Sequence, residues 1–391
     1  MGAISDADAA RLGLSPAARA VHEQSLVVDL HVDCLIQHQL FGYALDVEHD
    51  PERAAGPRPL RFALPRAIAR LTGSGHRPLY HHADLPRLRR GGYDCAALTL
   101  HYWPWASEGG WRSINRQLDY VEELLARDPR LTLARSPNDL RRAAGRGELA
   151  IFLAVEGLHC LGRGGKETET RRLDRLAQLR ARGVAYVTLA HLRGNDGARN
   201  GFGLGSDPDA GLTRFGREVV RQMNALGLVI DVAHVSRQGV LEVCALTQRP
   251  VIASHTALLG VEPQRRDQLA ARLLDDDGLR AVADTDGAVG LILCPRFLHG
   301  RDEGGLEQVL RQLRYGSDYL APHHRDPWRH FALGSDFDGW IPGIPRELRD
   351  AADLPLLSAA LTAGGLDAAP CRQFLGENFL RVWDAVLSGC A

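Results

Sequence analysis

The stretch LVVDLHVDCL, residues 26–35, has the composition of a buried strand but carries three polar side chains. Its apolar residues are mostly branched, as in the strands of a parallel sheet. Side chains alternate along a strand, so Asp29, His31 and Asp33 are expected to share one face. Buried polar groups are costly unless a partner satisfies them. The sequence therefore predicts a polar partner, such as a metal ion, on this face.

Apolar runs alternate with amphipathic stretches along the whole chain. The predicted strands are 26–33, 93–100, 149–156, 185–190, 228–233, 250–254, 288–294 and 331–335. Helices are predicted over 171–183, 213–227 and 306–316, where leucines and other apolar residues recur at helical spacing. Strands that alternate with helices form a parallel sheet, and eight such units close a (β/α)8 TIM barrel. An open, doubly wound sheet is the alternative.

The chain shows no clear linker, so we predict a single domain, 1–391. The barrel core is expected over about 26–340, followed by C-terminal helices over 341–391. The extra length relative to a minimal barrel is assigned to an insertion after the first strand, 43–82, and to those helices. The glycine-rich stretch GRGGKETET (162–170) fits neither phosphate-loop pattern, which argues against a nucleotide-binding fold.

Composition narrows the class of partner. Lys and Arg number 47 against 48 Asp and Glu, and this balance argues against nucleic acid or a membrane surface as a partner. The seven cysteines are scattered without a CxxC pair, which is typical of free thiols in a reducing compartment. The N-terminus has no apolar run of signal-peptide length. A cytoplasmic location is expected.

Six of the predicted strands end on residues that can bind a metal or move a proton. In a barrel, the carboxyl ends of the strands surround one mouth, where catalytic groups lie. Each residue alone is a weak signal, but the same pattern at the end of successive strands is hard to explain by chance. These residues are His31 and Asp33, Glu156, His191, His234, His255, and Asp336 with Asp338.

Imidazoles and carboxylates without thiolates suit zinc, and also manganese, cobalt or iron. Five ligands are too many for one tetrahedral catalytic ion, and they favour two ions that share a bridging carboxylate. Such a pair would acidify a bridging water, polarise a carbonyl and stabilise a tetrahedral oxyanion. Asp29 lies deeper in its strand and is expected to be structural or to support a ligand.

The chain resembles the membrane (renal) dipeptidase family, metal-dependent dipeptidases on a TIM barrel. The resemblance extends from about residue 26 to 384, nearly the whole chain. The longest match is GLTRFGREVVRQMNALGLVIDVAHVS, which ends at Ser236. The shorter matching segments are DLHVD, AVEG, YVTLAH, PVIASHTA, ALGSDFDG and GENFLRVW.

The resemblance implies two zinc ions per chain and a role for each site residue. His31 and Asp33 would hold the first ion, His234 and His255 the second, and Glu156 would bridge both. Asp336 would move the proton of the bridging water to the leaving nitrogen. The resemblance gives His191 the task of orienting the scissile carbonyl. An arginine after the last histidine ligand would bind the substrate carboxylate; of Arg265 and Arg266, spacing favours Arg266.

The chain departs from the family pattern at three places. Val32 replaces the usual asparagine between the first two ligands, but its side chain should point away from them. The loop HLRGNDGARNGFG after the fourth predicted strand also differs, and in the family this loop helps to shape the substrate pocket. Asp267 follows the arginine where asparagine is usual, and QLAARLLDDDG lengthens the link that follows.

The expected function is hydrolysis of dipeptides with a free C-terminal carboxylate, and tolerance of a C-terminal D-residue is implied by the resemblance. The alternative enzyme is a related amidohydrolase that acts on N-acyl amino acids or lactams at the same binuclear site. A catalytically inactive binding protein is disfavoured because all five ligand positions are filled. The expected partner is a small dipeptide, and the family also suggests a homodimer.

Overall fold

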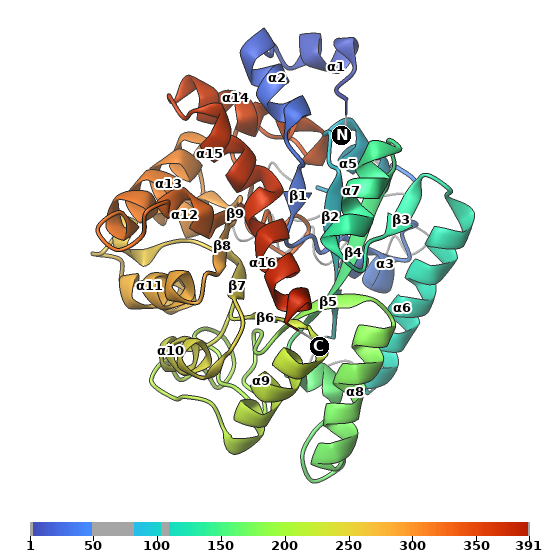
Figure 1. Ribbon diagram of the computed structural model, residues 1–391, viewed down its shortest axis with the longest axis vertical. Coiled ribbons are helices and arrows are strands. Elements are labelled where there is room, and N and C mark those ends of the chain that lie inside the picture. The colour runs from blue at the N-terminus through green and yellow to red at the C-terminus, as the bar shows by residue number, and fades with distance from the viewer. Residues whose placement is uncertain (1–2, 49–81, 103–108, 390–391) are drawn as a thin grey trace.

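The computed structural model describes residues 3–48, 82–102 and 109–389, and within these ranges eight parallel strands close into a barrel (Figure 1). Around the wall they are β1 (Val28–Asp29), β2 (Cys95–His101), β4 (Leu149–Glu156), β5 (Val184–Thr188), β6 (Val229–Asp231), β7 (Val251–Thr256), β8 (Ala288–Leu291) and β9 (Phe331–Leu333). β9 pairs with β1 through Leu333 and Asp29, and this contact closes the ring. The predicted TIM barrel is confirmed, and an open sheet is excluded.

One further strand, β3 (Leu131–Leu133), was not predicted. It pairs with Leu149–Ile151 at the start of β4, while β5 pairs with the later residues of β4. β2 occupies the other edge of β4 and completes the barrel there. β3 is therefore an addition outside the barrel wall. Its three residues are too few to show an alternating pattern in the sequence.

Helices cover the outside of the barrel and follow most of its strands. The three predicted helices are present as α8, α9 and α13, within a few residues of their expected bounds. The helices are α1 (Asp6–Arg11), α2 (Pro16–Gln24), α3 (Cys34–Phe41), α5 (Leu85–Arg90), α6 (Gly110–Arg127), α7 (Pro137–Gly145), α8 (Glu169–Ala181), α9 (Arg214–Leu226), α10 (Arg237–Leu246), α11 (Asp276–Asp284), α12 (Pro295–His299), α13 (Glu307–Leu320), α14 (Pro355–Ala363), α15 (Ala368–Arg372) and α16 (Asn378–Ser388).

Helix α9 shows why the sequence predicts these boundaries well. The Thr213 hydroxyl accepts a hydrogen bond from the backbone N–H of Gly216 at 3.1 Å and caps the first turn. At the other end, Gly227 has φ +67°, a left-handed conformation that glycine adopts without strain. Thr213 and Gly227 thus mark the two ends of the apolar repeat, and both can be recognised in the sequence.

The alternation of side chains along the strands separates two apolar cores. In β4, Ala150, Phe152 and Ala154 belong to the interior cluster of the barrel, and the residues between them pack outward against helices. α16 adds Phe379 and Trp383 to the interior cluster, with ring centroids 5.1 and 5.4 Å from that of Phe152. In Figure 1, α16 crosses the strands of the barrel. It closes the end at which the strands begin and leaves their carboxyl ends for the site.

The C-terminal helices predicted after the barrel are present as α14, α15 and α16. Most of the predicted insertion, residues 49–81, lies outside the described residues. None of the helices in the described part of the chain combines the length and the apolar character needed to span a membrane.

Candidate metal centre and substrate cavity

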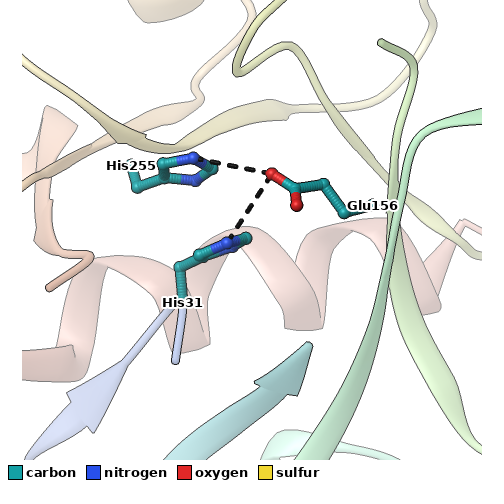
Figure 2. A group of neighbouring side chains, drawn as sticks. All are labelled: His31, Glu156 and His255. Atoms are coloured by element: carbon teal, nitrogen blue, oxygen red, sulfur yellow. Dashed lines mark ion pairs between the residues drawn. The ribbon is translucent and has the colours of Figure 1, made fainter. Parts of the chain in front are cut away.

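The five predicted metal ligands meet at the carboxyl ends of the strands, with Glu156 at their centre. Glu156 ends β4, His31 and Asp33 follow β1, His234 follows β6 and His255 lies in β7. The Oε1 atom of Glu156 lies 3.1 Å from His234 Nε2, and 3.7 Å from both His31 Nε2 and His255 Nε2. Figure 2 shows the last two contacts converging on one carboxylate oxygen. All five residues are buried.

The arrangement of donor atoms fits metal ions. Three groups of side chains each bring their ligand atoms within 4.8 Å of one another: His31, Glu156 and His255; Glu156, His191 and His234; and His31, Asp33 and Asp336. The Nε2 atoms of His234 and His255 are only 2.9 Å apart. His31 Nε2 and Asp33 Oδ1 are buried and have no hydrogen-bond partner among the described residues. Buried polar atoms that converge without partners are expected of metal ligands.

Electrostatics within the cluster also favour a cation. Burial, and then the nearby carboxylate of Asp33, raise the pKa of Glu156 well above its usual range. Burial also raises the pKa of Asp336 well above its usual range, although His31 opposes this. At His31 burial acts to lower the pKa, but the carboxylates of Asp33 and Glu156 outweigh it and raise the pKa to about 10. Carboxylates held this close repel one another unless positive charge lies between them.

Three other imidazoles of the cluster are held neutral. Burial lowers the pKa of His191, His234 and His255 well below the usual value, because it disfavours the charged imidazolium. A neutral imidazole keeps a lone pair for a metal ion. His191 Nε2 lies 3.1 Å from the second oxygen of Glu156, Oε2. His191 therefore joins the cluster from the end of β5, where the sequence predicted it.

The loop after β9 holds Asp336 beside this cluster with a strained backbone. Asp336, Asp338 and Trp340 have φ values of 59°, 66° and 61°, in the left-handed region that few residues other than glycine adopt. Between the last two lies Gly339, where a Cβ would collide with the Asp336 carboxylate. The backbone N–H of Asp336 donates to the carbonyl of His31 at 3.1 Å and joins the loop to the first ligand.

A cavity of about 500 Å³ lies over the cluster. Its polar floor includes Asp33, Glu156, His191 and Asp336. The loops after several strands supply an apolar wall, which includes Ile36, Leu192, Phe202, Leu269, Phe297 and Trp340. The cavity thus combines convergent polar groups with apolar walls, as sites for small molecules do.

Two arginines line this cavity, Arg272 and Arg296, and of these Arg272 is the buried one; the predicted Arg266 is not among the described residues that line it. Arg266 is exposed, and its guanidinium donates to the backbone carbonyls of Pro263 and Arg265 at 2.9 and 2.8 Å. Arg272 is buried, lines the cavity and donates from Nη2 to the His255 carbonyl at 2.8 Å. The structure therefore places Arg272, and not Arg266, next to the proposed ligands.

Comparison with known proteins identifies the family of the chain. The family model for membrane dipeptidases, peptidase family M19, matches residues 16–388. The chain belongs to the membrane dipeptidase family. This is a family of metallo dipeptidases, so the resemblance seen in the sequence is confirmed and the chain is a member of a hydrolase family. A curated relative from Klebsiella pneumoniae, described as an uncharacterized protein in the pqqA 5′ region, is 31% identical over 268 residues, 68% of this chain and 93% of that protein.

Solved structures share the fold of this membrane dipeptidase family member. The crystal structure of dipeptidase AC, a metallo peptidase of family M19, is 26% identical, with a TM-score of 0.71 over 93% of this chain and 99% of that one. A metallo peptidase from Rhodobacter sphaeroides, liganded with a phosphinate mimic of the dipeptide L-Ala-D-Ala, is 24% identical. Its TM-score is 0.70, over 93% of this chain and 100% of that chain.

Sequence reasoning missed several residues of the site in this membrane dipeptidase family member. Arg272 stands in the stretch RLLDDD, and its only signal was the unusual length of the link before it. Tyr186 and Ser254 contact His31 and His255 from inside the barrel, and Asp231 bonds Ser254. The sequence feature that could have indicated them is their position: they lie in strands followed by histidines, at alternating positions that face the interior of the barrel.

Proposed function

We propose that this member of the membrane dipeptidase family is a binuclear zinc dipeptidase acting on dipeptides with a free C-terminal carboxylate. The observation that carries the proposal is the central position of Glu156, whose Oε1 reaches three imidazoles and whose Oε2 reaches a fourth. His31 and Asp33 would hold one zinc ion, His234 and His255 the other, and Glu156 both. The ions would acidify a shared water and polarise the scissile carbonyl.

Arg272 would bind the C-terminal carboxylate of the substrate. Among the described residues no carboxylate lies within ion-pair distance of this buried guanidinium, which donates to the His255 carbonyl. A buried cation without an anionic partner is costly, and a substrate carboxylate would satisfy it through a pair of parallel hydrogen bonds. Since Arg272 donates to the carbonyl of His255, this anchor would stand at a fixed distance from the proposed ligand.

Asp336 and His191 would handle the charges that change during the reaction. Asp336 would accept a proton from the attacking water and deliver it to the leaving amine nitrogen as the C–N bond breaks. Its raised pKa suits a carboxyl group that must hold a proton between these two steps. His191 lines the cavity beside Glu156 and would orient the scissile carbonyl and stabilise its developing negative charge.

The C-terminal side chain of the substrate would lie near Phe297. The Arg272 guanidinium carbon is 6.0 Å from the centre of the Phe297 ring. The Cα atom of the last residue is one bond from its carboxylate, so a carboxylate bound to Arg272 would bring the side chain of that residue close to this apolar wall. Apolar C-terminal residues should therefore be preferred. Tolerance of a D-residue at this position is part of the proposal, and L-Ala-D-Ala is a suitable first substrate.

The test is a substrate panel on protein of measured metal content. It includes L-L dipeptides, L-D dipeptides, N-acyl L- and D-amino acids and a lactam. The expected result is preferential hydrolysis of dipeptides, about two zinc ions per chain, and loss of activity on chelation that zinc restores. If dipeptides were inert while N-acyl amino acids or lactams were hydrolysed, the alternative amidohydrolase would replace the dipeptidase. Full activity after removal of metal would refute both.

A further inference from the structure

A layer of buried polar side chains lies inside the barrel, below the proposed metal ligands. Val229 and Ile252 belong to the interior cluster, so Asp231 and Ser254, two residues further along β6 and β7, also face inward. Both side chains are fully buried. Polar groups inside an apolar barrel cost stability, and the proposed dipeptidase mechanism gives them no role. Their hydrogen bonds indicate what they do.

Asp231 accepts four hydrogen bonds. Its Oδ1 accepts from the backbone N–H groups of Ala233 and Ser254, at 3.0 and 2.8 Å. Its Oδ2 accepts from the hydroxyls of Thr188 and Ser254, at 2.5 and 2.6 Å. A carboxylate is an acceptor only, so the Ser254 hydroxyl proton is committed to Asp231. The Ser254 oxygen can therefore take part in a further hydrogen bond only as an acceptor.

The donor that meets the Ser254 oxygen is the imidazole of His255. His255 Nδ1 lies 2.9 Å from Ser254 Oγ. Because the hydroxyl proton points to Asp231, Nδ1 must carry the imidazole proton. The lone pair of the neutral ring is then on Nε2, the atom that lies 3.7 Å from Glu156 Oε1. Asp231 and Ser254 together determine which nitrogen of His255 is free.

A second hydroxyl places a proton on the Nδ1 atom of His31. His31 Nδ1 lies 2.9 Å from the Tyr186 oxygen, and the Tyr186 hydroxyl donates to the Leu30 carbonyl at 2.8 Å. A backbone carbonyl cannot donate, so the tyrosine oxygen must accept from His31. The third histidine, His234, has no such partner for its Nδ1 among the described residues. In two of the three proposed histidine ligands, a side chain inside the barrel thus determines that Nδ1 carries a proton.

We infer that Asp231, Ser254 and Tyr186 are positioning residues that hold His255 and His31 with Nε2 free for metal. The inference rests on the metal centre of the proposed function but assigns residues which that function does not use. Partners that orient a ligand histidine contribute about 10- to 100-fold to metal affinity in proteins. The hydroxyls should do so here without touching the substrate.

The test measures zinc affinity, by competition with a chromogenic chelator on metal-free protein that is then reloaded. Ser254→Ala should weaken zinc binding at one site by about 10- to 100-fold. Ser254→Thr keeps the hydroxyl and should restore affinity to within about threefold. Asp231→Asn keeps the shape of the side chain but presents an N–H that competes for the Ser254 oxygen, so it should also weaken binding. Tyr186→Phe should weaken zinc binding through His31.

Two matched substitutions separate positioning from stability. Ser358→Ala removes another buried serine that bonds a histidine, His22 Nδ1 at 2.8 Å, away from the cavity. Tyr93→Phe removes a buried tyrosine hydroxyl that has no hydrogen-bond partner in the part of the chain that the structure describes. Both controls should bind zinc like the unmodified protein, whatever their melting temperatures.

Several outcomes would overturn the inference. If Ser254→Ala, Asp231→Asn and Tyr186→Phe all bound zinc within twofold of the unmodified protein, the hydroxyls would have no positioning role. A loss of affinity in Ser358→Ala equal to that in Ser254→Ala would show a general effect of stability. If the unmodified protein bound no zinc, the inference and the metal centre of the proposed function would both fail. Zinc binding without dipeptide hydrolysis would overturn only the proposed substrate.

Discussion

Asp336 is the carboxyl group on which the proposed proton transfer depends. It lies within the His31, Asp33 and Asp336 group but is not one of the five ligands assigned by the proposal. Asp336→Asn should therefore lower kcat by about 10²- to 10⁴-fold, the usual contribution of a general acid–base group. The zinc content, measured by elemental analysis, should stay at the level of the unmodified protein.

The control for this substitution is Asp302→Asn. Asp302 lines the same cavity but is exposed and forms a 2.7 Å ion pair with Arg296. Its loss should change kcat by less than about threefold, since exposed ion pairs contribute little. Retained activity in Asp336→Asn, with the same zinc content, would remove Asp336 from the mechanism.

Arg272 and Arg266 offer a paired test of the carboxylate anchor. Arg272→Lys keeps the charge but loses the planar pair of donors, so kcat/KM for dipeptides should fall by about 10- to 100-fold, mainly through KM. Arg266→Lys, on an exposed side chain that donates to two backbone carbonyls, should stay within twofold. The measurement is steady-state kinetics of both variants on the same dipeptide, with kcat and KM determined separately. Equal effects of the two substitutions would contradict the assignment to Arg272.

The difference between these arginines shows how far the sequence predicts the site. Glu156 and His255 could be found because each lies at the end of a strand, and the barrel brings strand ends together whatever their distance in sequence. Arg272 lies in the segment after β7, where inserted residues alter the count and no period relates position to direction. Hydrogen-bond partners such as Asp231 and Ser254 have no spacing rule, because they come from neighbouring strands.

At the scale of elements, β1 marks a second limit of sequence reasoning. The apolar run predicted a strand over 26–33, but the ladder ends at Asp29. Beyond it an isolated bridge joins Val32 to Phe337, while His31 and Asp33 enter the site. An apolar run shows that a segment is buried and extended, but not where its hydrogen bonds to a neighbouring strand stop.

Helix α12 follows β8 and carries Phe297 into the cavity wall, which yields a prediction on substrate choice. Phe297→Ala should lower kcat/KM by about 10-fold for dipeptides with leucine or phenylalanine at the C-terminus, because burial of that side chain is lost. Dipeptides that end in glycine should change by less than about twofold and serve as the control. Equal losses for both kinds of substrate would place the C-terminal side chain elsewhere.

At the scale of the whole molecule, α16 closes one end of the barrel while the site occupies the other. Trp383 is fully buried in the interior cluster against Phe152 and Phe379. Trp383→Ala should lower the free energy of unfolding by about 3 to 5 kcal/mol, the usual cost of a large cavity in a core. Urea denaturation measures the loss. The KM of the folded fraction should stay unchanged, and a large change in KM would show that the two ends are coupled.

The N-terminal helix α2 and the C-terminal helix α14 pack together at a buried histidine, beside each other in Figure 1. His22 bonds Ser358 Oγ through Nδ1 and the Gly91 carbonyl through Nε2, and burial lowers its pKa from 6.5 to about 4. The folded state therefore binds fewer protons than the unfolded state between these two values. The stability that neutral His22 provides is complete above pH 6.5 and falls as the pH drops toward 4.

This linkage can be measured by comparing the unmodified protein with His22→Gln. Between pH 7.5 and 5.0, His22 should account for a loss of about 2 kcal/mol in the free energy of unfolding. His22→Gln should be less stable at pH 7.5. Its free energy of unfolding should fall by about 2 kcal/mol less on acidification, since glutamine does not titrate. Other buried histidines, such as His330, contribute equally to both proteins and cancel in the difference. If the two proteins lost the same free energy of unfolding on acidification, His22 would not be the group that links protonation to unfolding.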